Sequence, residues 1–150
     1  MTDKINLVRK ATEEDSRRIW AIRNHPICRQ NFHDQKEIDF KHHKVWFKEQ
    51  YFNKSDNRCY VLEKDSKVIG YCRFDLKNSS YLISIAIDPV YQGLGLGSQL
   101  LGKASKKLKT VRDILAEVQR INPASIKIFE QNNFERYKED KEYYYYKLKK

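Results

Sequence analysis

The chain has few of the residues that mark specialised protein classes. Its 150 residues include only five glycines, three prolines and three cysteines. So little glycine and proline excludes collagen-like and linker-like chains. Cys28, Cys59 and Cys72 are odd in number and lack C-x-x-C spacing, which indicates neither a disulfide framework nor a zinc knuckle. No apolar run approaches the ~20 residues of a membrane-spanning helix, and the first residues lack the apolar region of a signal peptide, so we expect a cytoplasmic protein.

Positive charge is in excess. The chain carries 30 Lys and Arg against 20 Asp and Glu, a formal net charge of +10. This balance favours anionic partners such as nucleic acid, a membrane surface or phosphorylated small molecules, although solubility alone explains it equally well. The charge is dispersed and no nucleic-acid recognition motif accompanies it. A basic nucleic-acid-binding module is therefore kept only as an alternative from another functional class.

Hydrophobic periodicity and turn signals predict one layered α/β domain over residues 1–150. We expect a strand at 5–9 and then a helix at 13–24, opened by a capping box of Thr12 and Asp15 and ended by Pro26. The further elements expected are a helix after Asp39, strands at 59–64, 67–76 and 81–87, a helix from 95 to 108, a strand at 114–119, a helix from 123 to 132, and closing strands at 134–138 and 143–148.

A short turn joins the first two strands of the central group. If Asp65 and Ser66 form a two-residue turn, Cys59 and Cys72 lie opposite each other on neighbouring strands. Two small buried thiols are a better interpretation of such a pair than a redox centre.

The most informative segment is a glycine-rich loop between a buried strand and a helix. Asp88 and Pro89 turn the chain, and Gln92-Gly93-Leu94-Gly95-Leu96-Gly97 opens the helix. Glycines let main-chain N–H groups approach a ligand, and a helix N-terminus favours negative charge, so a phosphate or pyrophosphate is expected. The dinucleotide-binding pattern G-x-G-x-x-G can start at Gly93 or at Gly95, and neither alignment has glycine or alanine at its last position. The nucleotide-binding pattern starting at Gly97 has Ala104 in place of the Mg²⁺-binding hydroxyl.

The remaining pattern, Gln-x-x-Gly-x-Gly after Ile-Asp-Pro, resembles the acetyl-CoA loop of the GNAT acetyltransferases. The three-strand meander before it, the helix and strand after it, and NPASIKIFEQNNF at 122–134 also match that family over nearly the whole chain. The resemblance implies the GNAT fold, an α+β arrangement with a mixed, mostly antiparallel sheet flanked by helices. It also implies an N-acetyltransferase with acetyl-CoA as cosubstrate and no metal. No zinc pattern is matched by His25, Cys28, His33, His42 and His43.

The resemblance further implies where acetyl-CoA binds. The pantetheine arm would lie in a V-shaped opening between the strands at 84–87 and 115–119, and main-chain N–H groups of residues 92–98 would hold the pyrophosphate. The residues expected at the cofactor are Ile85, Ala86, Ile87, Gln92, Gly93, Leu94, Gly95, Leu96, Gly97, Ser98, Asn122, Ser125 and Phe129.

Two positions depart from the family pattern. Many relatives have a tyrosine that protonates the departing thiolate where this chain has Phe129, which cannot donate a proton. Thiols titrate near pH ~8.5, so coenzyme A can leave with help from water or another tyrosine. Relatives also carry a glutamate near the start of the strand containing Leu82. Here Asp75 and Glu117 are the candidate catalytic bases, and a structural ion pair is the competing interpretation of each.

A more particular pattern concerns the acetyl acceptor. Arg23-Asn24-His25-Pro26, Ile38-x-Phe40-x-x-His43-x-x-Trp46-Phe47 and Gly70-x-x-Arg73-Phe74-Asp75 resemble the branch that acetylates nucleotide-linked deoxy-aminosugars in pseudaminic-acid and related surface-glycan pathways. Aromatic rings would stack on sugar or uracil, and arginines would neutralise a diphosphate. The residues expected at this substrate are Arg23, Asn24, His25, Trp46, Phe47 and Arg73, with core packing as the competing role of Phe47. Protein N-terminal acetyltransferases of the ribosomal-protein type and small-amine acetyltransferases are the alternatives, and the sequence leaves open a monomer or a homodimer.

Overall fold

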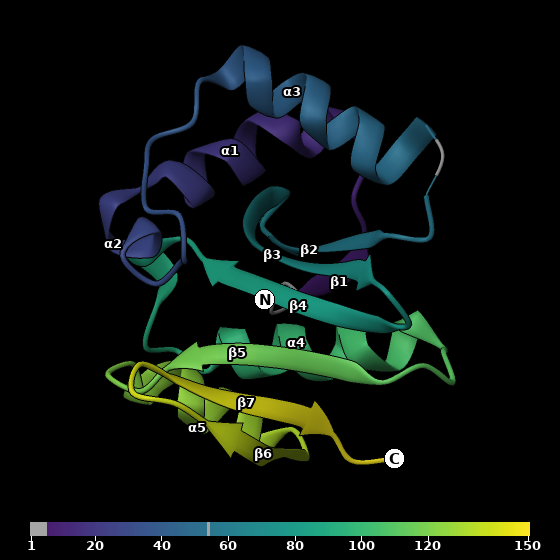
Figure 1. Cartoon of the computed structure of the whole chain (residues 1–150). Coiled ribbons are helices and arrows are strands. Elements are labelled where there is room, and N and C mark those ends of the chain that lie inside the picture. The colour runs from purple at the N-terminus through teal and green to yellow at the C-terminus, as the bar shows by residue number, and fades with distance from the viewer. Residues whose placement is uncertain (1–5, 54) are drawn as a thin grey trace, which may run out of the picture.

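The computed structural model describes residues 6–53 and 55–150, and a seven-stranded sheet runs through it (Figure 1). The strands are β1 (Leu7–Lys10), β2 (Arg58–Lys64), β3 (Lys67–Lys77), β4 (Ser80–Ile87), β5 (Ile114–Gln119), β6 (Phe134–Glu139) and β7 (Tyr143–Leu148). Their order across the sheet is β1-β2-β3-β4-β5-β7-β6. Only β4 and β5 pair in parallel within this described sheet, so the expected mixed, mostly antiparallel arrangement is confirmed.

Helices cover both faces of the sheet. The helices are α1 (Ser16–Asn24), α2 (Pro26–Arg29), α3 (Phe40–Lys48), α4 (Leu96–Leu108) and α5 (Pro123–Gln131). One core packs α1 and α3 against the sheet around Phe47 and Tyr71, and the other packs α4 and α5 around Leu100 and Phe129. Among the described residues, no helix is long and apolar enough to cross a membrane.

The predicted elements are present, with changes at their ends. The expected first helix divides into a 3-10 turn, η1 (Glu13–Asp15), and α1, and Thr12 forms the predicted capping box with Asp15. Pro26 follows the end of α1, as expected, and is also the first residue of α2, where its fixed φ suits a helix start. Of the expected first strand, Ile5 lies outside the described residues, and β1 begins at Leu7.

The predicted pairing of Cys59 with Cys72 is wrong by one residue. A β-bulge after Leu62 shifts the register of β2 against β3, so Cys59 lies opposite Arg73 and Cys72 lies opposite Tyr60. Successive residues of a strand face opposite sides of the sheet. The two thiols therefore belong to different cores.

The strands β4 and β5 run side by side at one end only. Their parallel pairing joins Tyr81 to Ile114 and Leu82 to Leu115, and then it stops although both strands continue. The strands separate beyond these pairs and leave part of each edge free of the other. This separation is the opening that the family resemblance implies.

Candidate active site

A cavity of about 600 Å³, which we call the donor cleft, lies at the end of β4. Its walls come from β4, the glycine loop, the start of α4, one side of α5, and α2 with the segment after it. The predicted cofactor residues that line it are Ile85, Ala86, Ile87, Gln92, Gly93, Gly95, Leu96, Gly97, Ser98, Asn122 and Ser125. The structure thus brings together residues from three separate stretches of the chain.

The glycine loop adopts backbone angles that other residues rarely adopt. Gly93 and Gly95 have φ angles of 82° and 77°, and Gly95 is the N-cap of α4. A Cβ atom at either position would meet nothing within 4 Å, so the surface there is open. The first N–H groups of α4 have no partner inside the helix and carry its positive dipole end. The loop is therefore shaped and polarised to receive an anionic group, and it fits the pyrophosphate of a coenzyme A ester.

Polar side chains hold the walls of the donor cleft. The Gln92 amide Nε2 donates to the carbonyl of Ile87 at 2.9 Å and closes the turn after β4. Asn122 caps α5, because its Oδ1 accepts from the Ser125 N–H at 3.2 Å and its Nδ2 donates to the Ser125 Oγ at 3.0 Å. These bonds hold the turn after β4 and the first turn of α5, which form two walls of the cleft.

Two of the predicted cofactor residues do not line the cleft. The ring of Phe129 is only 4% exposed and packs against Phe134 and Tyr146, with centroid distances of 5.1 Å and 6.1 Å. The position that holds a tyrosine in many relatives therefore faces the core. Leu94 stands between two glycines with positive φ, and it is 63% exposed. The structure leaves both residues outside the donor cleft.

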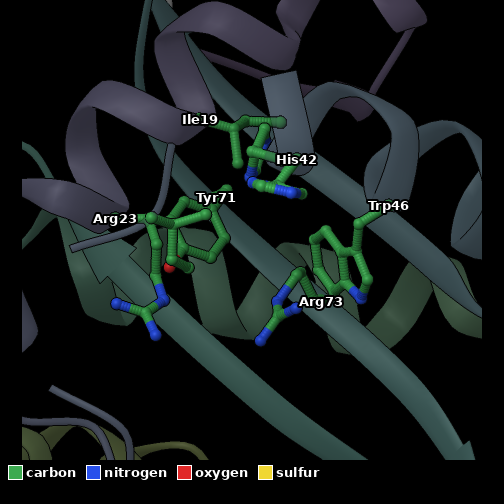
Figure 2. A pocket seen from close by; sticks show the side chains of 8 residues that line it. Ile19, Arg23, His42, Trp46, Tyr71 and Arg73 are labelled. Atoms are coloured by element: carbon green, nitrogen blue, oxygen red, sulfur yellow. The ribbon is translucent and has the colours of Figure 1, made fainter. Parts of the chain in front are cut away.

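A second cavity, the acceptor pocket, has a volume of about 390 Å³ and lies between α1, α3 and β3 (Figure 2). It is lined by Ile19, Arg23, Ile38, His42, His43, Trp46, Tyr71 and Arg73. Three predicted substrate residues, Arg23, Trp46 and Arg73, thus come together from three elements. Sequence reasoning missed Tyr71, although strand periodicity indicates it, since it shares a face of β3 with Arg73.

The other three predicted substrate residues have structural roles. Phe47 is 1% exposed and packs in the core under α3. Asn24 holds the main chain of Ile38, donating to its carbonyl at 2.7 Å and accepting from its N–H at 2.8 Å. The His25 Nδ1 accepts from the Ile27 N–H at 3.1 Å and caps α2. These residues shape the pocket's surroundings without lining it.

Polar atoms of the acceptor pocket lack partners within the protein. Arg23 Nη1, His43 Nε2, Tyr71 Oη and Arg73 Nε are buried without a hydrogen bond, and all four residues line this cavity. Figure 2 shows the two guanidinium groups extending on the same side of Tyr71. Because buried polar groups are normally paired, four such atoms around one cavity indicate a polar ligand.

Burial and neighbouring charges set the protonation of this pocket. Burial, together with Arg73 and Arg23, lowers the pKa of His43 to about 4, so its imidazole is neutral at neutral pH. Burial also lowers the pKa of Arg23. Burial acts in the same direction on Arg73, but Tyr51 and Asp75 outweigh it and raise the pKa of its guanidinium. Arginine stays charged in proteins, so the pocket is cationic.

The two candidate bases lie in different surroundings. Asp75 lines neither cavity, and its carboxylate faces the Tyr51 hydroxyl and Arg73. Glu117, on β5, has its Oε1 2.8 Å from Nε2 of His33. Asp75 therefore has the ion-pair partner of the competing interpretation and Glu117 has a hydrogen-bond partner, and the role of each as a base stays a prediction.

The cysteines are buried free thiols. Burial raises the pKa of Cys28 to about 11, and it also raises the pKa values of Cys59 and Cys72. Cys28 lines the donor cleft, where its protonated Sγ donates to the carbonyl of Ile87 at 3.5 Å. Within residues 6–53 and 55–150, no three His, Cys, Asp or Glu side chains gather into a group that could hold a metal ion.

Comparisons with known proteins agree with this geometry. Residues 7–134 match the model of the acetyltransferase (GNAT) family. The chain is 31% identical over 144 residues to acetyltransferase PseH of Campylobacter jejuni subsp. jejuni (strain 81-176), covering 92% of this chain and 90% of that one. The solved N-acetyltransferase of Staphylococcus aureus Mu50 has a TM-score of 0.79 and 26% identity, covering 96% of this chain and 98% of that one.

A second similar structure was solved with the donor. It is yncA from Salmonella typhimurium with its cofactor acetyl-CoA, with a TM-score of 0.80, 20% identity, and coverage of 96% of this chain and 93% of that one. At this identity the likeness shows the fold, while the family model covers most of the chain. The glycine cradle and the split strands fit the same donor. The chain therefore belongs to the GNAT acetyltransferase family and is an N-acetyltransferase with acetyl-CoA as its acetyl donor.

Proposed function

We propose that this enzyme acetylates the amino group of a nucleotide-linked deoxy-aminosugar in the cytoplasm. The observation that carries the proposal is the acceptor pocket, where two half-buried arginines each have a buried, unpaired N–H group beside one cavity. The resemblance of three acceptor segments to the aminosugar branch of the family supports the same substrate class.

The charge of the pocket separates the candidate acceptors. Guanidinium groups bind phosphate oxygens with two parallel N–H bonds, so Arg23 and Arg73 together suit a diphosphate. A polyamine carries several positive charges that these groups would repel. A protein N-terminus brings no diphosphate for the two guanidinium groups to bind. A nucleotide-linked sugar is the acceptor class that pairs them.

The remaining groups of the pocket suit the uncharged parts of such a molecule. The Trp46 ring lies with its centroid 5.0 Å from the Arg73 guanidinium and, partly exposed, offers a face for a sugar or a pyrimidine base. The neutral His43 and the Tyr71 hydroxyl each offer a hydrogen bond to a sugar hydroxyl or a base edge. Cations, an aromatic face and neutral hydrogen-bonding groups are thus combined around one cavity.

The two cavities are placed for direct transfer. Tyr71 and Arg73 line the acceptor pocket, and their cross-strand partners on β4 are Ala86 and Ser84. Ala86 lines the donor cleft, so one strand ladder separates the two ligands. The amine nitrogen attacks the acetyl carbonyl in a ternary complex, and no acetyl-enzyme forms because the cysteine thiols are buried and protonated.

The acceptor class is tested by turnover with acetyl-CoA and a panel of amines. The panel contains a UDP-linked aminodideoxyhexose, the same aminosugar without the nucleotide, a peptide with an N-terminal alanine, and spermidine. We expect the highest kcat/KM with the nucleotide-linked sugar, and competition by UDP against that sugar rather than against acetyl-CoA. Faster turnover of the peptide or spermidine would contradict the proposal. A larger thermal shift with an oligonucleotide than with UDP would favour the nucleic-acid alternative.

Two variants test whether the nucleotide of the substrate binds in the acceptor pocket. Arg23→Gln removes a charged donor, and hydrogen bonds to charged groups are worth about 1.5–3 kcal/mol, so kcat/KM for the nucleotide-linked sugar should fall roughly 10- to 100-fold. Turnover of the aminosugar without the nucleotide should fall much less, by the amount that loosening of the Phe32–Asp34 segment costs. Lys44→Gln removes a positive charge from an exposed position of α3 and serves as the matched control.

A further inference from the structure

A hydrogen bond joins two distant parts of the chain beside the two cavities. Nε2 of His33, in the segment between α2 and α3, lies 2.8 Å from Oε1 of Glu117 on β5. The imidazole also stacks on the ring of Tyr143, with centroids 4.3 Å apart and an interplanar angle of 20°. Its side chain is 63% exposed, so solvent and a ligand can both reach it. A carboxylate and a ring thus orient an accessible imidazole.

The segment that carries His33 borders both cavities. Phe32, the preceding residue, lines the donor cleft, and Ile38 lines the acceptor pocket. Arg23 fastens this segment, because its guanidinium lies 4.2 Å from the Phe32 ring centroid and its Nη2 donates to the Asp34 carbonyl at 3.1 Å. His33 is therefore held between a residue of the donor cleft and a residue of the acceptor pocket.

The register of the sheet places Glu117 at the start of the strand separation. Leu82 pairs with Leu115, so Ser84 and Glu117 are the residues two positions further along β4 and β5. Ser84 is also the cross-strand partner of Arg73. Arg73, Ser84 and Glu117 therefore lie in a row across one face of the sheet, and this row leads from the acceptor pocket to Glu117. This row crosses the end of the opening that lies farthest from the glycine loop.

We propose that His33 is the catalytic base that takes a proton from the acceptor amine, and that Glu117 positions it. A carboxylate acceptor at Nε2 fixes the tautomer with a proton on that nitrogen and leaves Nδ1 with a free lone pair. Glu117 also stabilises the imidazolium that forms. The proposal rests on the acceptor pocket described above for the approach of the amine.

The proposed step balances in atoms and charge. The acceptor ammonium gives one proton to Nδ1 of His33, and the freed nitrogen lone pair forms a C–N bond to the acetyl carbon. The C–S bond breaks with its electrons on sulfur, the second amine proton neutralises that sulfur, and His33 releases its proton to water. The efficiency of a base is greatest when its pKa lies near the working pH, which suits an imidazole better than a carboxylate.

Several charged and titratable groups surround the dyad and will influence its titration. They are Arg23 and Asp34 beside the loop, Tyr143 and Tyr145 on β7, and Tyr137 and Lys138 on β6.

The test compares pH profiles of kcat/KM with whichever amine of the panel is turned over fastest. His33→Gln should lose about 10²-fold or more near neutral pH and recover at high pH, where the amine is already deprotonated. Added imidazole should restore part of the lost rate. Glu117→Gln should lose less and move the rising limb of the profile. Glu135→Gln on β6 removes an exposed carboxylate elsewhere and is the matched control.

A second readout separates catalysis from folding. The thermal shift of His33→Gln with acetyl-CoA should equal that of the parent, since the donor cleft is unchanged. A parental pH profile in His33→Gln, or a loss uniform across pH without imidazole rescue, overturns the proposal. Because the assay uses the fastest amine of the panel, failure of the nucleotide-sugar assignment is seen separately, in the panel itself.

Discussion

The hydroxyl of Tyr51 donates a 2.5 Å hydrogen bond to Oδ1 of Asp75, and Oδ2 of the same carboxylate lies 3.8 Å from Nη1 of Arg73. Tyr51 belongs to the π-helical turn η2 (Glu49–Asn53), which follows α3 directly. The carboxylate compensates the charge of an arginine that lines the acceptor pocket. These contacts favour a structural role for Asp75 in holding Arg73.

Asp75→Asn should therefore destabilise the protein more than it alters proton transfer. The amide can still accept from Tyr51 but cannot compensate the charge of the half-buried guanidinium 3.8 Å away. We expect a clear fall in Tm, a higher KM for the acceptor and an unchanged pH profile. An intact Tm with kcat/KM lowered about 10²-fold and a shifted profile would instead make Asp75 the base and exclude His33.

Gly95→Asp should abolish the stabilisation of the fold by acetyl-CoA. The substitution strains a residue with a φ of 77° and adds negative charge where an anion is expected. Saturating donor at 100 times its Kd stabilises the parent by about 2.7 kcal/mol, which differential scanning fluorimetry detects. Val111→Asp adds the same charge at a site that is 97% exposed and should keep the full shift. Gly97 is less suitable, since a Cβ there would lie 2.8 Å from Ile128 Cδ1.

Alanine at all three cysteines should leave substantial turnover. Cys28 alone lines the donor cleft among the three, and its thiol, with a pKa raised to about 11, is protonated at neutral pH. The combined variant should lose some thermal stability, since Cys59 and Cys72 fill space in the cores. Mass spectrometry of the parent incubated with acetyl-CoA should find no acetyl-cysteine. A stoichiometric adduct would replace direct transfer by a covalent mechanism.

Stability should fall as the pH is lowered from neutrality toward about 4, the pKa to which burial brings His43. An unfolded histidine titrates near pH ~6.5, so between these values the unfolded chain binds a proton that the folded chain excludes. The contribution of His43 to the free energy of unfolding is complete above pH ~6.5 and is lost as the pH falls to about 4. Calorimetry should give a shallower pH dependence of Tm for His43→Gln than for the parent. His42→Gln, at an exposed position of the same helix, should follow the parent.

Phe129→Tyr should bring no gain in rate and should lower the Tm. The ring lies in the core, and a buried hydroxyl without a partner costs about 1–3 kcal/mol. Tyr91, which does line the donor cleft, is the better tyrosine to test as an acid. A marked rise in kcat for Phe129→Tyr would show that the position reaches the leaving thiolate after all.

The fold and the donor cleft follow closely from local sequence signals. The element boundaries follow from hydrophobic periodicity, and the glycine loop was recognisable because positive φ angles at Gly93 and Gly95 require glycine. The sequence did not show that Leu94 and Phe129 lie outside the lining of the cleft, because spacing in a motif does not say which side of the backbone faces a cavity, and their roles at the cofactor stay predictions. The same lack of information put Phe47 among the substrate residues.

The acceptor side was harder to predict because its contacts join distant residues. His33 and Glu117 are 84 positions apart, and no local pattern signals their contact. The offset of Cys59 from Cys72 arises from one bulge, which the turn residues Asp65 and Ser66 do not encode. Register and long-range side-chain contacts are set by the packing of the whole sheet rather than by neighbouring residues.

Because β4 and β5 pair in parallel through only two residue pairs, the sheet consists of two parts with few hydrogen bonds between them. Strands β1 to β4 form one part and β5, β7 and β6 form the other, and the two parts meet at the short pairing of β4 with β5. A donor that pairs with the free strand edge beyond these two residue pairs holds the two parts of the sheet together. Local opening exposes chains to proteases, and a ligand that binds the closed form suppresses it. Acetyl-CoA should therefore slow the cleavage of this enzyme by added proteases.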